Sequence, residues 1–406
     1  MTDTESLLIK NFGPIAEAAI DVNKVTVLIG RQGSGKSTVA KLYSVFSWLE
    51  KSLMRHSLTE AHITQYHRFR KTYCAFNNIS DYFRDDTVLR FNGTHFQFQY
   101  ENDRLQVNST DSNDDTFNIS KVMYIPAERS ILGSTDHPYT LKGLSDPMST
   151  FRDEYSDARN KYKSGYIFPF DDIRFEYDAL NDIPRLKHNG DFDIKLSAGS
   201  SGFHSSLPML LVSKNLTEMV KNSSAKSDLT EQGLQALNKE VRRIMEDTTL
   251  SYEVRMASLH SISSRFRYSR FINIVEEMEL NLFPDSQRGA LYELIADANV
   301  LPANKLMLTT HSPYLINYLT LAIKAHELTG KASDDSRAMK RISEIVPPSS
   351  QIPSTDVTIY EMEDGSARRL SDYHGLPSDD NFLNLRLEAT NTDFDSLLDI
   401  EEDTEL

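Results

Sequence analysis

The sequence predicts an α/β fold organised around a P-loop core sheet, and three observations support this prediction. Residues 30–38, Gly-Arg-Gln-Gly-Ser-Gly-Lys-Ser-Thr, fit the phosphate-loop pattern G-x-x-x-x-G-K-S/T. Residues 25–29, Val-Thr-Val-Leu-Ile, have the composition of a buried parallel strand, and a helical pattern follows the loop. Two later apolar runs end in Glu276-Glu277 and in His311, as strands do when their carboxyl ends line a ligand crevice.

Composition places the chain among ordinary globular proteins. Its 406 residues suffice for a large core and for two or three domains. The net charge of -15 argues against a nucleic-acid footprint over the whole surface, although a local basic groove stays open. Cys74 is the single cysteine, which excludes an intrachain disulfide and a cysteine zinc cluster. The polar, acidic N-terminus and the absence of a bilayer-length apolar run predict a cytoplasmic protein with no membrane partner.

The phosphate loop supplies most of the candidate binding residues. Its glycines allow positive φ and a close approach of the backbone, so that several N–H groups can point at a phosphate chain. Lys36 is expected to reach the β- and γ-phosphates, and the Ser37 hydroxyl is expected to hold Mg²⁺. The expected nucleotide-binding set is Gly30, Gln32, Gly33, Ser34, Gly35, Lys36, Ser37 and Thr38.

The N-terminal part of the chain predicts β elements around this loop. Residues 7–21 read as two short strands around a turn. Phe12 in that turn has two open interpretations, a cover for a nucleotide base or an aromatic side chain of the core. Residues 88–107 alternate and contain an Asn-Gly hairpin signal, which predicts a small antiparallel meander. The helix after the loop has one apolar face, formed by Val39, Tyr43, Phe46 and Leu49.

One segment of the chain, residues 51–86, is both basic and interleaved with aromatic residues. Its polar and aromatic members include His56, His62, His67, Arg68, Arg70, Lys71 and Tyr73. This composition makes the segment a candidate surface for a partner or for nucleic acid. The alternative is a solvated helical face that covers core aromatics.

The middle of the chain predicts a strand, a lobe and a second anion site. Residues 122–125 read as a buried strand that ends near the crevice. Residues 133–193 read as a helical lobe with linkers, and residues 191–196 as a short strand. Residues 196–202, Leu-Ser-Ala-Gly-Ser-Ser-Gly, open a leucine-rich helix, which is the geometry of an anion site. Residues 252–268 are expected to carry one more strand.

The candidate catalytic side chains come from the carboxyl ends of two strands. Residues 271–275 form an apolar strand that runs into Glu276 and Glu277. A Mg²⁺ partner and a water-orienting base belong at such a place, on the same sheet as a phosphate loop. The strand at residues 305–310 ends at His311, and Pro313 is well placed to begin the next helix.

The remainder of the chain predicts a less regular extension. Residues 330–353 read as a polar linker, and residues 357–362 as a strand. From Asp393 the chain is acidic with an apolar stripe, which predicts an amphipathic helix. Two interpretations of this helix stay open, docking on a partner or packing on its own domain. The apolar stripe consists of Phe394, Leu397, Leu398 and Ile400.

This ordered set of motifs resembles the ABC-type ATPase head shared by the overcoming-lysogenisation-defect (OLD) nucleases, RecF and SMC proteins, over residues 5–330. The implied fold is an ABC-ATPase head with a P-loop core sheet, N-terminal antiparallel β elements and an inserted helical lobe. The run Pro126-Ala127-Glu128-Arg129 also looks like a segment of stand-alone AAA-family ATPases of bacterial defence. The landmarks are the phosphate loop, Ser200-Ser201-Gly202, the Glu-Leu-Asn-Leu-Phe-Pro run at residues 279–284, and Thr309-Thr310-His311-Ser312-Pro313.

The resemblance implies how nucleotide is bound. In the family, two heads meet head to tail and sandwich ATP between the phosphate loop of one and the signature loop of the other. Ser200 and Gly202 would then contact the γ-phosphate of the partner's nucleotide. An alternative frame of the signature uses Ser197 and Gly199.

The resemblance also implies catalytic roles. Glu277 would be the base, His311 would sense the γ-phosphate, and Lys36 would stabilise its charge. Glu276 stands where the family usually has aspartate, so its extra methylene makes slow or absent turnover more plausible, while Mg²⁺ contact through water survives. The Q-loop glutamine of the family has no clear counterpart, and Glu128 occupies its neighbourhood.

These features together predict a stand-alone head that controls a separate effector. The chain shows no Toprim or HNH nuclease cluster and no coiled-coil arm. It resembles the ATPase subunits of anti-phage systems such as Septu and PARIS, which implies an ATP-dependent sensor or scaffold that controls a nuclease. The alternatives are a nucleotide-locked scaffold with little turnover and a RecF-like DNA-repair ATPase.

The expected division of the chain follows from this interpretation. Residues 1–50 and 88–130 form the β and P-loop part of the head, 51–87 a helical insertion, 131–225 a helical lobe with the signature, 226–330 the rest of the head, and 331–406 an extension that could dock a partner.

Overall fold

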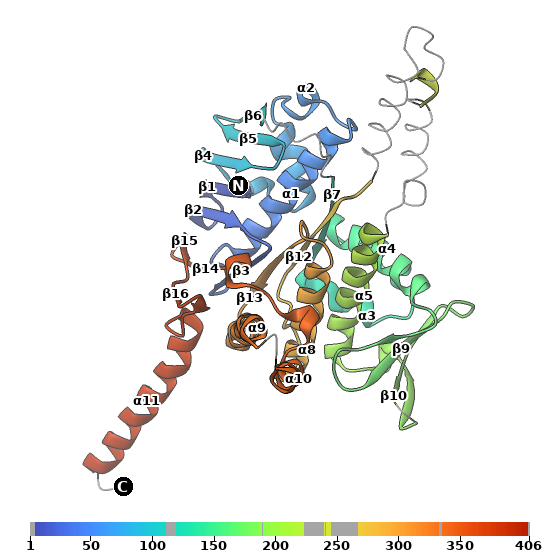
Figure 1. The fold of residues 1–406 in the computed structure, drawn as a ribbon. Coiled ribbons are helices and arrows are strands. Elements are labelled where there is room, and N and C mark those ends of the chain that lie inside the picture. Colours follow the sequence, from blue (N-terminus) through green and yellow to red (C-terminus); the bar gives the residue numbers. More distant parts are fainter. Residues whose placement is uncertain are drawn as a thin grey trace.

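An eleven-stranded sheet organises the molecule, and its strands follow the order β6-β5-β4-β1-β2-β15-β14-β3-β13-β12-β7 (Figure 1). The structure is a computed structural model that describes residues 5–110, 119–188, 190–222, 239, 241–244, 267–332 and 335–404. The strands are β1 (Glu5–Phe12), β2 (Ile15–Val22), β3 (Val25–Gly30), β4 (Phe83–Asn92), β5 (Phe96–Glu101), β6 (Arg104–Ser109), β7 (Ser120–Ile125), β12 (Arg270–Val275), β13 (Lys305–Thr310), β14 (Val357–Glu363) and β15 (Ser366–Arg369). The strand expected within residues 252–268 lies almost entirely outside the described residues.

One half of the sheet is the predicted P-loop core. Strands β14, β3, β13, β12 and β7 are parallel neighbours, so their carboxyl ends meet at one edge. Alternate side chains of β3 point to opposite faces of the sheet, and both faces are covered. Val25, Val27 and Ile29 pack into one core cluster, whereas Leu28 packs into the cluster on the opposite face. Both faces of the strand are therefore buried, as the apolar run predicted.

The other half of the sheet is antiparallel and confirms the predicted N-terminal β elements. Strands β1 and β2 form a hairpin, and β4, β5 and β6 form the meander that joins β1. Phe12 is 0% exposed and its ring packs edge-on against Phe83, with 4.8 Å between the centroids. The core interpretation of Phe12 is confirmed, and a role as a cover for a nucleotide base is wrong, because the ring is enclosed by its own domain.

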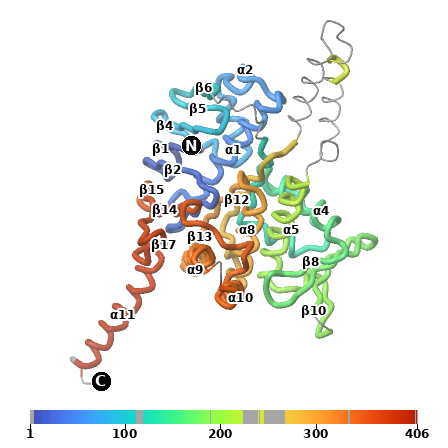
Figure 2. The backbone as a smooth tube through the Cα atoms, viewed as in Figure 1, coloured from blue at the N-terminus to red at the C-terminus, as the bar shows by residue number. Residues whose placement is uncertain are grey.

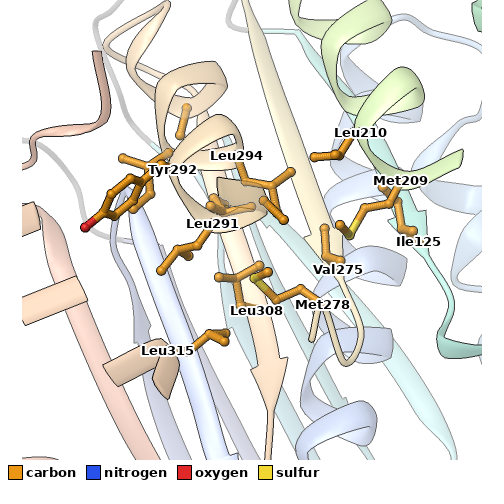
Figure 3. Packing of buried hydrophobic residues seen from close by; sticks show 14 of the residues in the cluster. Ile125, Met209, Leu210, Val275, Met278, Leu291, Tyr292, Leu294, Leu308 and Leu315 are labelled. Carbon is orange, nitrogen blue, oxygen red and sulfur yellow. The ribbon is translucent and has the colours of Figure 1, made fainter. Parts of the chain in front are cut away.

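Helices cover both faces of the parallel half. On one face lies α1 (Lys36–Met54), whose predicted apolar side, Val39, Tyr43, Phe46 and Leu49, is buried. The opposite face is covered by α4 (Asp146–Lys161), α5 (Ser201–Lys221), α8 (Pro284–Asn299) and α9 (Pro313–Lys331). Figure 3 shows the second packing, in which Val275 and Leu308 from the sheet meet Leu291 of α8 and Met209 of α5.

The lobe expected to be helical also contains a second sheet. Its four strands are β8 (Tyr166–Ile167), β9 (Ile173–Asp178), β10 (Ile183–His188) and β11 (Phe192–Lys195), in the order β11-β10-β9-β8. Strand β11 confirms the short strand predicted near residue 191, whereas β8 to β10 correct the helical prediction for this part of the lobe. Charged residues alternate with Ile173 and Phe175 in β9, so the strand buries only one face and its apolar signal is weak.

The C-terminal part of the chain returns to the central sheet. Strand β14 lies between β15 and β3, although the sequence assigned these residues to an extension beyond the head. The expected linker contains a helix, α10 (Ser336–Ile345), which starts where the Asp335 carboxylate accepts hydrogen bonds from the Arg337 and Ala338 N–H groups. No residue of α10 is fully buried, but Met339, Ile342 and Ile345 form an apolar stripe, and Ile342 packs against the core. The polar composition of residues 330–353 concealed this helix in the sequence interpretation.

The last helix projects away from the body of the molecule (Figures 1 and 2). This helix, α11 (Phe382–Thr404), begins well before the predicted start at Asp393. Its apolar stripe is exposed, with 59% of Phe394 and 62% of Leu397 accessible, so the stripe does not pack on its own chain. In the described residues, no helix combines the length and hydropathy needed to cross a lipid bilayer.

Candidate functional site

The candidate site lies at the carboxyl edge of the parallel strands. The phosphate loop follows β3, the paired acids follow β12, His311 follows β13, and the run 126–129 follows β7. Because these four strands are parallel neighbours, their ends bring together side chains that are far apart in the sequence. The fold thus assembles the residues that the sequence predicted as one site.

The glycines of the loop are required by its backbone. Gly30, Gly33 and Gly35 have φ values of +143°, +75° and +102°. A Cβ on Gly30 would lie 2.2 Å from the Met362 carbonyl oxygen of β14, and a Cβ on Gly35 would lie 2.7 Å from the Ile15 side chain. The loop therefore fits between neighbouring elements only without side chains at these positions, which leaves the start of α1 open toward a ligand.

Lys36 occupies the centre of the loop. Its side chain is buried, and its ammonium donates hydrogen bonds of 2.8 Å to the carbonyl oxygens of Gly30 and Arg31. Burial lowers the pKa of Lys36 to about 8, against the opposing influence of the nearby carboxylates of Glu277, Glu279 and Glu276. The ammonium is held in the curl of the loop, as the phosphate-loop motif requires.

The other predicted loop residues differ in accessibility. Gln32 and Ser37 are exposed, whereas Thr38 is buried beneath the first turn of α1. The Ser34 hydroxyl is buried and has no hydrogen-bond partner. A buried hydroxyl without a partner costs free energy, so its presence in the loop fits a ligand that supplies one.

The paired acids lie in a strained turn. Glu276 is 5% exposed, and its Oε1 atom is buried without a hydrogen-bond partner. Glu277 has φ +42°, which is unfavourable for a residue with a side chain, and its N–H donates to the Thr309 hydroxyl at 3.1 Å. Strain of this kind is common in catalytic turns, and here it is fixed by contacts with the neighbouring strand.

His311 faces Glu277 across the site. The His311 Nε2 atom lies 3.6 Å from Glu277 Oε1, and both side chains are about one-third exposed, at 32% and 30%. Burial and the nearby Lys36 ammonium lower the pKa of His311. The imidazole is therefore neutral at pH 7 and able to donate or accept one hydrogen bond at each nitrogen.

Sequence reasoning missed two residues that hold this arrangement. Glu279 accepts a hydrogen bond of 2.6 Å from the His311 backbone N–H, and its Oε2 atom is buried without a partner. Burial raises the pKa of Glu279. The position of Glu279 in a landmark run marked it as part of the family pattern, but nothing in the sequence indicated contact with the next strand.

The second missed residue is Arg129, which is 0% exposed. Its guanidinium donates to the carbonyl oxygens of Glu276 at 2.6 Å and Glu277 at 2.7 Å. It also donates to the carbonyl oxygen of Pro126 at 3.2 Å and to that of Ser205, on α5, at 3.1 Å. Arg129 therefore ties the acid turn to the helix that carries the signature. Glu128, expected near the Q-loop position, is exposed.

The two frames of the signature differ in their surroundings. Ser200 is exposed and occupies the N-cap position of α5 with an extended backbone and without a side-chain capping hydrogen bond. Ser197 instead donates a hydrogen bond of 2.7 Å to Asp136 within its own chain. Gly202 packs closely on the turn after β12, because a Cβ there would lie 2.9 Å from the Asn281 carbonyl oxygen.

The residues present fit a nucleoside triphosphate with Mg²⁺. The donors available for a metal are carboxylate and hydroxyl oxygens, from Glu276 and Ser37, which are the ligands that Mg²⁺ prefers. Mg²⁺ commonly uses one or two such ligands together with phosphate oxygens. The unpartnered atoms at Ser34, Glu276 and Glu279 are consistent with a site completed by a ligand.

Comparisons with known proteins identify a family for the chain. The family model described as "AAA ATPase domain" matches residues 4–254. No curated protein matches the chain. Similar solved structures include the SMC head domain from Thermotoga maritima, with 11% identity, a TM-score of 0.34, and coverage of 91% of this chain and 99% of that chain.

Two further solved structures also match the chain at low identity. The recombination mediator protein RecF has 9% identity and a TM-score of 0.29, covering 91% of this chain and 99% of its own. A nucleotide-free ATP-binding cassette from an ABC transporter has 10% identity and a TM-score of 0.30, covering 91% of this chain and 93% of its own. Identities and TM-scores this low carry no argument about the site or its chemistry.

Proposed function

The chain belongs to the AAA ATPase domain family, and from this premise we propose that its carboxyl-edge site binds ATP with Mg²⁺ and hydrolyses it to ADP and phosphate. One observation carries the proposal. The phosphate-loop lysine, the paired acids and the histidine come from three neighbouring strands and meet at one edge, with Glu277 and His311 within 3.6 Å of each other.

Binding would begin at the phosphate loop. The first N–H groups of α1 have no partner within the helix, and they point at the place where the β-phosphate would lie. Lys36 would exchange its hydrogen bonds to Gly30 and Arg31 for phosphate oxygens, and Ser34 would gain a partner for its buried hydroxyl. The remaining loop positions, Gln32, Gly33 and Thr38, would shape the same cradle.

Hydrolysis would rest on Glu277. Its carboxylate would orient a water molecule and accept its proton while the water oxygen bonds to the γ-phosphorus and the bond to the β–γ bridging oxygen breaks. Lys36 would stabilise the charge that develops on the phosphate oxygens. Mg²⁺, when bound through Ser37 and Glu276, supplies further neutralisation of that charge. His311 would hold the γ-phosphate by a hydrogen bond and would report its loss.

The signature supports a head-to-tail dimer. Ser200 is exposed at the start of α5, so it is free to meet the nucleotide of a second copy together with Gly202. Ser197 is already engaged by Asp136, which makes the frame of Ser197 and Gly199 the weaker candidate. Each composite site would then use the acid turn of one copy and the signature of the other.

The downstream role is proposed from the same resemblance. We place the protein in a bacterial anti-phage complex, where ATP-dependent dimerisation controls a separate effector, with a nuclease as the expected partner. The exposed stripe of α11 supports docking of such a partner, because helices bind grooves through apolar residues spaced along one face. A RecF-like role in DNA repair is the alternative, and it predicts ATP-dependent DNA binding with a steep dependence on salt.

Phosphate release by the purified full chain tests the proposal. The wild-type protein should release phosphate from Mg-ATP, and Glu277→Gln should lose this turnover while it keeps ATP binding. Glu344→Gln, which changes an exposed carboxylate on α10, is the matched control and should stay active. If the wild-type protein binds ATP but matches Glu277→Gln in turnover, the nucleotide-locked scaffold is the correct function.

A further inference from the structure

A cavity separate from the carboxyl-edge site lies beside β7, the strand at one end of the central sheet. It has a volume of about 340 Å³ and lies between α1, β7, α4 and the segment that begins with the π-helix η1 (Phe69–Cys74). This volume falls within the range of small-molecule sites. The segment is the basic, aromatic one that the sequence singled out, and π-helical turns are frequent at functional sites.

The wall of this cavity is apolar and aromatic, and no charged side chain lines it in the described part of the chain. Trp48 on α1 and Phe76 after η1 lie at its mouth, each 41% exposed. The rings of Trp48 and Tyr73 are 5.9 Å apart. Such a wall suits a flat aromatic group, because exposed aromatic side chains gain most by stacking on another ring.

Two polar atoms of the wall are buried and unpartnered. They are the hydroxyl of Tyr73 and the amide oxygen Oδ1 of Asn77. Each of these residues is at most 9% exposed. Buried polar groups are almost always hydrogen-bonded, so these two atoms fit a ligand that supplies both a donor and an acceptor.

A cluster of cations lies next to this cavity. Lys51 follows Trp48 by one turn of α1, Lys121 precedes the lining residue Val122 on β7, and Arg55 is the C-cap residue of α1. The Arg55 guanidinium lies 4.3 Å from the ring centroid of Tyr268, and its Nε and Nη2 atoms have no hydrogen-bond partner among the described residues. The Glu154 carboxylate lies 2.6 Å from the Lys121 ammonium, and Lys121 also interacts electrostatically with Asp157.

The cations of the cluster repel one another. Burial, together with repulsion from Lys121 and Arg55, lowers the pKa of Lys51 to about 7, against the opposing influence of Glu154. A bound phosphate would relieve this repulsion and would accept hydrogen bonds from the Arg55 guanidinium.

We propose that this cavity is a second nucleotide site, which takes a nucleoside monophosphate with its base against Trp48, Phe76 and Asn77 and its phosphate on Lys51, Arg55 and Lys121. The site is separate from the phosphate loop but linked to it. Helix α1 carries both Lys36 and Lys51, and the lining residue Tyr124 lies on β7, which pairs with the strand β12 that leads to Glu276. Nucleotide in the cavity would therefore alter the rate of ATP turnover.

Binding of 2-aminopurine riboside 5′-monophosphate tests the site directly, because stacking quenches its fluorescence. The full chain should bind this probe saturably. Lys36→Ala, which removes phosphate-loop binding, should leave the affinity unchanged, so failure of the proposed ATPase function and failure of this site are distinguishable. Loss of probe binding in Lys36→Ala would overturn the proposal, since the probe would then occupy the phosphate loop.

Two kinds of variant locate the probe. Thr150→Trp fills the cavity from an exposed position of α4 and should reduce the affinity at least about tenfold. Arg55→Gln removes a phosphate contact and should reduce it by about tenfold. The matched controls are Thr392→Trp on α11 and Lys340→Gln on α10, both exposed. Equal affinities in the cavity variants and the controls would overturn the proposal.

Competition identifies the source of the nucleotide. AMP and a single-stranded oligonucleotide both present a base and a phosphate, so each should displace the probe if the cavity binds these groups. The competitor that binds more tightly identifies whether the natural ligand is a free nucleotide or a nucleic acid. Displacement by either that is lost in Arg55→Gln supports the site. Displacement by neither, or absence of saturable probe binding in the wild-type protein, would overturn it. Arg55→Gln is a conservative change in a half-buried side chain, so the test survives even if Thr150→Trp fails to fold.

Discussion

Two regions of the same sheet differ in how they are built. The carboxyl edge is made of backbone turns, in which positive φ values at Gly30, Gly33, Gly35 and Glu277 shape the site. The cavity beside β7 is made of side chains from four segments, with ordinary backbone around most of them. The first region is encoded by short motifs, whereas the second exists only after folding, so a sequence can reveal one and conceal the other.

The largest expected effect separates the two regions. Gly30→Ala should abolish ATP binding, because the new Cβ would overlap the Met362 carbonyl oxygen and the backbone has φ +143°. Probe binding in the cavity beside β7 should remain. Calorimetry with Mg-ATP and fluorescence with the probe measure the two effects. Wild-type ATP affinity in this variant would show that the loop does not need its tight fit to β14.

Arg129 tests how far the backbone turns depend on one side chain. Arg129→Met removes a buried cation from four carbonyl oxygens and should lower the free energy of unfolding by about 3–5 kcal/mol. Chemical denaturation measures this loss. The exposed Arg341→Met on α10 is the control and should change stability by less than about 0.5 kcal/mol. A small decrease in the free energy of unfolding of Arg129→Met would mean that the turn with Glu276 and Glu277 keeps its conformation without Arg129.

The pH dependence of stability sharpens the account of the cation cluster. The pKa of Lys51 is about 7 in the folded protein, below the ordinary value of 10.5. The folded state therefore binds fewer protons than the unfolded state between these values, and stability should rise with pH across that window. The positive charges of Lys121 and Arg55 disfavour the protonated form of Lys51, whereas the carboxylate of Glu154 favours it.

Denaturant titrations at pH 6 and pH 9 compare the wild-type protein with Lys51→Met. The wild-type protein should gain more stability than the variant as pH rises. If stability depends on pH equally in Lys51→Met and in the wild-type protein, then the pKa of Lys51 is not lowered by burial and by its cationic neighbours.

The smallest expected effect concerns the contact between the start of α11 and the phosphate loop. The Arg31 guanidinium lies 5.2 Å from the ring centroid of Phe382, the first residue of α11. Phe382→Leu keeps an apolar contact but removes the ring, and it should lower the free energy of unfolding by about 0.5–1 kcal/mol. Thermal denaturation measures it, with Phe394→Leu as the exposed control on the same helix. If the free energy of unfolding falls equally in Phe382→Leu and Phe394→Leu, the contact between Arg31 and Phe382 contributes nothing to stability.

The sequence predicted the carboxyl edge well because strands and turns there are local. The run Val-Thr-Val-Leu-Ile before Gly30 and the acids after β12 identified the strands and their order along the chain. Arg129 and Glu279 were missed because their partners lie on other strands, at distances that no local spacing encodes. The place of β14 beside β3 was missed for the same reason.

The lobe and the C-terminal segments show a second limit. Strands β9 and β10 alternate charged and apolar residues without long apolar runs, and β8 has only two residues. Periodicity detects an element through the face it buries, so such short strands leave little signal. Helix α10 does carry an apolar stripe, Met339, Ile342 and Ile345, which the polar composition around it concealed. The cavity beside β7 adds a third case, because its lining residues are unremarkable until α1, η1, β7 and α4 come together.

Equilibrium binding of Mg-ATP to the full chain tests the central claim most directly. Isothermal titration calorimetry should show saturable binding to the wild-type protein and none to Lys36→Ala, whose melting temperature without nucleotide should stay close to that of the wild type. Binding of equal strength by both proteins, or no binding by the wild-type protein, would contradict the account, because the ammonium held by Gly30 and Arg31 would then have no ligand to receive.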